Sequence, residues 1–105
     1  MVGRLATYNV SGDARDLARR AEEGILPIFR SQPGFQGYTV SLGDDGQIYS
    51  MSAWDTRSDA EAGSEAAAEY VAQHMAGELE LTGVRYAEML FSTPFGITTL
   101  AGATA

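Results

Sequence analysis

The chain has no cysteine, and its 105 residues include only seven lysine and arginine side chains against 14 aspartates and glutamates, giving a formal net charge of −7. Without cysteine there is no disulfide frame, no thiolate metal site and no cysteine nucleophile. The excess of negative charge would repel a phosphate backbone or an anionic lipid surface. We therefore expect neither a nucleic acid nor a membrane as a partner.

Long apolar runs are also missing. No stretch approaches the ~20 residues of a membrane span, and the first residues contain no apolar run of signal-peptide length, so a cytoplasmic protein is expected. The chain shows no metal-ligand spacing, Ser/His/Asp order, phosphate loop or dinucleotide fingerprint. We expect no metal and no cofactor, and a single domain over residues 1–105.

Apolar and polar side chains alternate in four segments, which predicts strands at residues 2–10, 35–42, 47–54 and 84–91. A tight glycine- and aspartate-rich connection at 43–46 joins the second segment to the third. This pair is expected to form a β-hairpin.

Two helices are predicted between these strands. The first covers residues 14–30 after cap residues that end at Asp13, with a kink expected where Pro27 removes an amide proton. The second opens at Ser58, which has Glu61 three residues later in the form of a capping box, and runs to about residue 79. Its inward stripe is expected to contain Ala60, Gly63, Ala67, Val71, His74 or Met75, and Leu79.

The order strand, helix, strand, strand, helix, strand predicts an α+β ferredoxin-like βαββαβ domain with an antiparallel four-stranded sheet. Helices in this arrangement cover one face of the sheet only. The strands nevertheless carry large apolar groups on both faces: Ile48 and Trp54, for example, alternate with Tyr49 and Met51. A second copy of the sheet would cover the other face, so we predict a homodimer.

Several segments resemble the antibiotic biosynthesis monooxygenase (ABM) domain over nearly the whole chain. They are the turn Pro33-Gly34-Phe35, the strand from Ser50 to Trp54 with Asp55 after it, and the alanine-rich second helix. The segment Thr93-Pro94-Phe95-Gly96-Ile97 is similar to the one that follows the fourth strand in members that oxidise aromatic polyketides.

The resemblance implies a dimeric α/β barrel with a mostly apolar pocket between sheet and helices in each subunit. In such a dimer we expect the tail, residues 92–105, to pack on the partner. The resemblance also implies a cofactor-independent monooxygenase that oxidises a phenolic or polycyclic aromatic small molecule with molecular oxygen. The alternative is a non-catalytic dimeric barrel that binds a small apolar ligand. Haem binding is a third option, although the histidine ligand of the haem-degrading branch falls at Gln73 here.

By the same resemblance, Trp54 matches a pocket-lining tryptophan and is expected to stack on the substrate, unless it is simply a core aromatic. The chain differs from the polyketide-oxidising members at two nearby positions. Ser50 stands where those members have asparagine, and Ala60 stands where they have tyrosine. Ser50 still offers a hydroxyl that could bind a phenolic oxygen.

Two further residues are candidates for proton transfer. His74 is the only histidine, and its ordinary pKa near ~6.5 suits a general base, the alternative being a packed or half-exposed side chain. Asn9, at the end of the first strand, is a candidate for the pocket or for turn initiation before Gly12.

Overall fold

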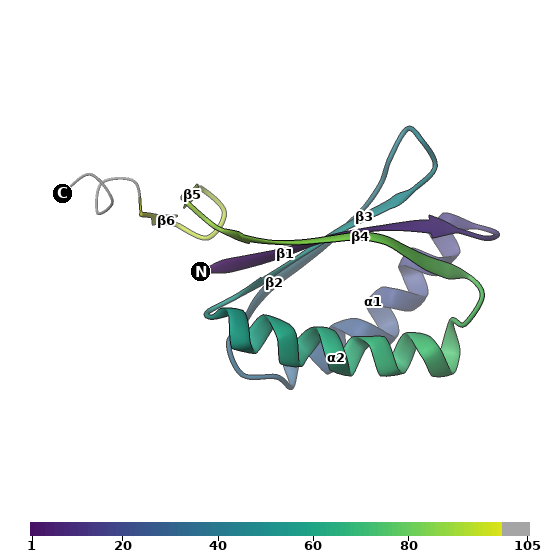
Figure 1. Cartoon of the computed structure of the whole chain (residues 1–105), viewed down its shortest axis with the longest axis horizontal. Coiled ribbons are helices and arrows are strands. Elements are labelled where there is room, and N and C mark those ends of the chain that lie inside the picture. Colours follow the sequence, from purple (N-terminus) through teal and green to yellow (C-terminus); the bar gives the residue numbers. More distant parts are fainter. Residues whose placement is uncertain (100–105) are drawn as a thin grey trace.

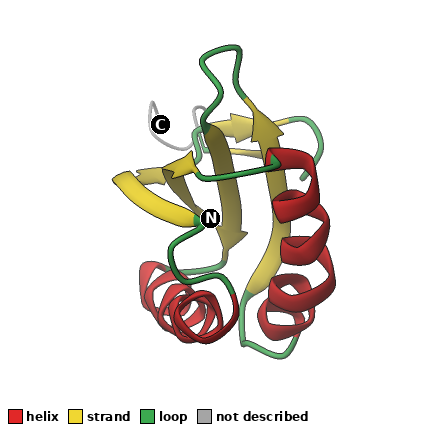
Figure 2. Cartoon of the chain, turned by 90° about the vertical axis from the view of Figure 1, so that its right-hand side faces the viewer, coloured by secondary structure: helices red, strands yellow, loops and turns green. Residues whose placement is uncertain are grey.

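The structure, a computed structural model, describes residues 1–99. Four antiparallel strands form one sheet in the order β2-β3-β1-β4, with bounds β1 Val2–Val10, β2 Phe35–Leu42, β3 Ile48–Trp54 and β4 Leu79–Glu88. The helices α1 (Ala14–Arg30) and α2 (Arg57–His74) both lie on one face of this sheet and leave the other face open (Figure 1). Figure 2 shows one helix at the lower left of the strands and the other along their right-hand side. The predicted ferredoxin-like α+β fold is confirmed.

The first helix has the predicted bounds and cap, but no restart at Pro27. The Asp13 carboxylate caps α1 by accepting hydrogen bonds from the backbone amides of Arg15 (2.9 Å) and Asp16 (3.3 Å). The helix then runs without a break through Pro27 to Arg30, so Pro27 falls in the last turn and does not end the helix. One side chain per turn points into the core, namely Leu17, Ala21, Ile25 and Phe29.

The second helix differs from its prediction at both ends. Its cap is Thr56, whose hydroxyl accepts from the amide of Asp59 at 3.1 Å, and not Ser58. It ends at His74 rather than near residue 79, because Gly77 adopts a left-handed backbone (φ +79°) that turns the chain back to the sheet. Accordingly β4 begins at Leu79, paired with Val10, instead of at residue 84.

The densest part of the core surrounds Trp54, which is fully buried at the end of β3. Its ring meets Phe29 and Phe35 edge-on, with centroids 5.1 Å and 5.3 Å away. Gly63 of α2 lies directly over the indole, where a Cβ atom would overlap the ring atoms. Trp54 therefore sets how closely the first half of α2 approaches the sheet.

We expect Gly63→Ala to lower the free energy of unfolding by about 1–3 kcal/mol, since the added methyl overlaps the indole, although Ala normally favours a helix over Gly. Urea unfolding monitored by circular dichroism measures this change. In a Trp54→Phe background the smaller ring leaves room, so the same substitution should there become neutral or stabilising. A Gly63→Ala protein more stable than wild type would contradict the close contact.

The open face of the sheet is partly apolar, with Leu5 exposed by 44% and Tyr49 by 41%. A short ribbon, β5 (Phe91–Ser92) with β6 (Ile97–Thr98), follows β4. Between its strands Phe95 packs on Gly37, where a Cβ would come within 2.7 Å of the phenyl ring. This part of the tail thus covers the edge of its own sheet, and residues 100–105 lie outside the described residues. No helix within residues 1–99 has the length and apolar character needed to cross a membrane.

Candidate functional site

A cavity of about 280 Å³ separates the sheet from the two helices. Its sheet side is formed by side chains of β1, β2, β3 and β4, namely Arg4, Tyr8, Tyr38, Ser50, Ser52, Leu79 and Leu81. Its helix side consists mostly of small or apolar side chains, namely Ile25, Phe29, Ser64, Ala67, Ala68, Val71, Ala72 and Ala76. The cavity is therefore mostly apolar on its helix side and largely polar on its sheet side, which we call the floor.

Strand register explains the polar floor. Tyr38, Ser52, Arg4 and Tyr86 are successive cross-strand neighbours over all four strands, on the face that the helices cover. Ser50 lies in the next row, between Val40 and Ala6. Side chains at neighbouring positions of one face stand about 5 Å apart, so Tyr38, Ser52, Arg4 and Ser50 surround one volume, and Tyr86 continues the row beyond the cavity lining.

Trp54 contributes to this floor indirectly. The structure places it in the core beneath Gly63 and outside the cavity lining. Its indole Nε1–H donates a hydrogen bond to the Ser52 hydroxyl oxygen at 2.8 Å, and both groups are buried. Because Ser52 lines the cavity, the indole fixes the direction in which that hydroxyl points.

Tyr38 stays protonated over the physiological range. Burial raises the pKa of its phenol to about 12, with a smaller rise from Tyr8 and an opposing effect from the positive charge of Arg4. Arg4, Tyr8 and Tyr38 all line the cavity, so the three groups lie close together. The Tyr38 hydroxyl is thus a hydrogen-bond donor on the cavity floor.

The raised pKa predicts a loss of stability at high pH. Folded Tyr38 holds its proton to about pH 12, whereas the unfolded side chain releases it near 10.0, so the free energy of unfolding falls as pH rises between these values. The fall attributable to Tyr38 should be on the order of 2 kcal/mol. Urea unfolding at several pH values measures it, and Tyr38→Phe should remove that part of the slope. A slope unchanged in Tyr38→Phe would show that the phenol is not buried.

The candidate residues from the sequence do not meet at one point. Ser50 is buried and lines the cavity. His74 is exposed at the end of α2, with its ring centroid 4.5 Å from that of Tyr70. Asn9 is exposed, and its amide donates to Glu80 (3.0 Å) and accepts from Gln47 (2.9 Å). Neither His74 nor Asn9 lines the cavity.

Sequence reasoning missed the most polar member of the floor, Arg4. A usable signal was present, because Arg4 is in phase with Ala6, Tyr8 and Val10 on the face of β1 that packs against the helices. A charged residue in phase with the buried face of a central strand is unusual, since arginine is rarely buried unless paired. Ser52 could have been found by the same argument on β3.

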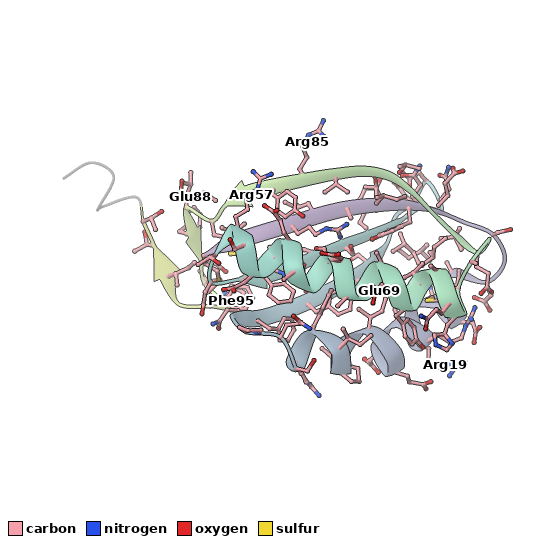
Figure 3. The ribbon with its side chains drawn as sticks, turned by 60° about the horizontal axis from the view of Figure 1, so that its bottom comes forward. Arg19, Arg57, Glu69, Arg85, Glu88 and Phe95 are labelled. Carbon is pink, nitrogen blue, oxygen red and sulfur yellow. The ribbon has the colours of Figure 1, made fainter. Side chains whose placement is uncertain are left out.

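A second, more open cavity of about 450 Å³ lies on the other face of the sheet, lined among others by Leu5, Tyr49 and Met51. Arg85 projects from the same side, away from α2 (Figure 3). Within residues 1–99, no group of three histidine or acidic side chains is placed to hold a metal ion.

The sheet, its two helices on one face and the cavity between them define a ferredoxin-like α+β domain. The family model described as antibiotic biosynthesis monooxygenase matches residues 1–73, and the chain belongs to this family. In sequence, no curated protein matches the chain.

Solved structures share the fold at low sequence identity. SnoaB, a cofactor-independent oxygenase from Streptomyces nogalater, superposes with a TM-score of 0.71 and 14% identity, covering 89% of this chain and 96% of that one. MupZ from Pseudomonas fluorescens gives 0.69 and 9%, covering 89% of each chain. MhuD, a haem degrader from Mycobacterium tuberculosis, gives 0.67 and 19%, covering 89% and 99%.

Proposed function

We propose that this protein is a cofactor-independent monooxygenase that oxidises a phenolic or polycyclic aromatic small molecule in the cavity between sheet and helices. The observation that carries the proposal is that cavity, with apolar walls and a floor of hydroxyl groups around Arg4. Membership of the monooxygenase family and the shared fold with the oxygenase SnoaB support it.

The cavity suits a compact aromatic ligand. Its volume of about 280 Å³ lies near the lower end of the roughly 300–1,000 Å³ typical of small-molecule sites. The alanine-rich face of α2 and the ring of Phe29 would contact the aromatic rings. We propose that the hydroxyls of Ser50 and Tyr38 bind the phenolic oxygen.

Removal of the phenolic proton needs a different explanation from the one expected from the sequence. Neither a carboxylate nor an imidazole is among the described residues that line the cavity. His74 and Asn9, the proton acceptors expected from the sequence, would have to act from outside it. We propose instead that the ligand loses its proton to water through its own acidity, and that the cavity favours the resulting anion.

The balance of the reaction then requires only the ligand and oxygen. A ring carbon of the phenolate forms a bond to O₂, the ring supplies the electrons that reduce it, and the resulting peroxide anion takes a proton from water to become a hydroperoxide. The hydroperoxide then loses water as its O–O bond and the C–H bond at the same carbon break. One oxygen atom remains as a quinone carbonyl and the other leaves in the water. The protein binds the ligand, orients it and excludes solvent.

A bulky side chain in the cavity wall should slow the reaction strongly. With 1,5-dihydroxynaphthalene as probe, wild type should consume one oxygen molecule per quinone formed, and Ala67→Phe should lower kcat/KM at least about tenfold, because Ala67 lines the cavity from the half-buried side of α2. An oxygen electrode and the quinone absorbance measure both quantities.

The matched control is Ala62→Phe, which adds the same ring to an exposed position of α2 outside the cavity. It should behave as wild type. Binding of the probe without oxygen uptake above the uncatalysed rate would instead support the alternative, a non-catalytic barrel that binds a small apolar ligand. Haem binding, seen in MhuD, has less support, since the only histidine of this chain lies outside the cavity.

We further propose that two copies of the chain pair through the open faces of their sheets. Leu5 and Tyr49 are exposed there, and Met51 lines the open cavity between them. Covering such a surface with its own copy removes apolar area from water without a second kind of chain.

Light scattering at micromolar concentration should therefore give about twice the mass of one chain. Met51→Glu should shift the mass toward one chain, because pairing through this face would bury one added charge from each chain. Ala62→Glu, which adds the same charge on the exposed side of α2, should leave the mass unchanged. A wild-type protein with the mass of a single chain would exclude the pairing.

A further inference from the structure

We infer that Arg4 binds an ionised oxygen of the ligand, so that the cavity takes an aromatic anion, either an acidic phenol or an aromatic carboxylate. The inference rests on the proposed function for the choice of cavity and adds the substrate class. It concerns binding, which can be measured without turnover.

Arg4 is held in the middle of the cavity floor. Its strand, β1, is hydrogen-bonded on both sides, to β3 through the pair with Ser52 and to β4 through the pair with Tyr86. The side chain extends toward the helices and lines the cavity. A guanidinium keeps its positive charge at physiological pH, so a fixed positive charge faces the enclosed volume.

No protein group neutralises this charge in the part of the chain that the structure describes. The Nε atom of Arg4 is buried without a hydrogen-bond partner. The ion pairs among residues 1–99 are all formed by Arg19, Arg20 and Arg57. Arg20 Nε also lacks a hydrogen bond but lies 3.2 Å from the Asp16 carboxylate. Arg4 has no such neighbour, and although the residue as a whole is only half-buried, a partly buried charge without a partner is unfavourable.

The other polar groups near Arg4 are neutral. Ser50 and Ser52 carry hydroxyls, and the Tyr38 phenol keeps its proton because burial raises its pKa to about 12. Glu88, opposite Val2 on the same face of the sheet, is exposed and forms no ion pair. The missing negative charge must therefore come from the ligand.

An aromatic anion would fit both the positively charged floor and the apolar helix side of the cavity. Its ionised oxygen would accept charge-assisted hydrogen bonds from the guanidinium, while its rings contact the alanines of α2. For a phenol, favouring the anion lowers the pKa of the bound hydroxyl. The same contact would thus produce the electron-rich form that reacts with oxygen.

The carboxylate case is tested by calorimetry under nitrogen with a hydroxynaphthoate and its uncharged amide, which have nearly the same shape. Wild type should bind the carboxylate at least about tenfold more tightly than the amide, and Arg4→Met should bind the two equally. Arg57→Met is the matched control: this exposed guanidinium lies 4.5 Å from the Tyr86 ring centre outside the cavity, and its loss should not alter the preference.

The phenolate case is tested with a nitronaphthol, whose anion absorbs visible light. Bound to wild type, it should ionise about one pH unit lower than in water, equivalent to tenfold tighter binding of the anion, and Arg4→Met should remove this shift. If the bound nitronaphthol ionises at lower pH but the carboxylate binds no better than the amide, the site is assigned to phenols. If the carboxylate is preferred but the nitronaphthol shows no shift, the site is assigned to aromatic acids. If wild type shows neither effect, or Arg4→Met retains both, the inference is wrong.

Two further measurements distinguish a binding role of Arg4 from a structural role. Because the charge of Arg4 is unpaired, Arg4→Met should melt at the same temperature as wild type or higher, whereas a marked fall would show a structural role and overturn the inference. Arg4→Lys should keep part of the preference. Anion preference without quinone formation would refute the oxygenase proposal and leave this inference standing. Quinone formation by Arg4→Met at the wild-type rate would support the oxygenase proposal and refute this inference.

Discussion

The contact between the Trp54 indole and Gly63 is the constraint on which the rest of the site depends. At this end of the molecule the large rings of Phe29, Phe35 and Trp54 fill the space between sheet and helices, and a glycine is needed for α2 to lie against them. Further along α2 the sheet-facing side chains are alanine and valine, too short to reach the floor. Because a rigid helix cannot bend down to close the gap, the space remains open. The cavity thus results from large side chains at the Trp54 end of α2 and small side chains further along the same helix.

The fold was largely predictable because its signals are local. Alternation gave the four strands, and the Asp13 cap and the three-four spacing gave α1 with its observed bounds. The errors at α2 come from a conflict between two signals. Val71, Met75 and Leu79 continue a helical spacing, but the left-handed backbone at Gly77 ends the helix, and Leu79 enters the core from a strand. Periodicity alone cannot show that consecutive core residues belong to different elements.

The site was harder to predict, because it depends on how the strands are aligned and on how deeply each side chain is buried. Ser50 was named for its hydroxyl, and it does line the cavity. The row from Tyr38 through Ser52 and Arg4 to Tyr86 exists only once four strands are aligned, and no sequence spacing reveals that alignment. His74 illustrates the question of depth: one helix position separates it from buried Met75, and this rotation of ~100° leaves its ring outside, against Tyr70.

The second helix is fixed to the sheet at two points, Gly63 over the indole and Met75 in the smaller core cluster with Leu17 and Ile48. Twelve residues separate these anchors, a distance of about 18 Å along a helix. That span sets the length of the helical roof over the cavity, to which this segment contributes side chains from Ser64 to Ala72. Inserting one helical turn between the anchors would lengthen the roof by about 5 Å and return each anchor to nearly the same face. The spacing between Gly63 and Met75 thus fixes how much of the sheet α2 can cover.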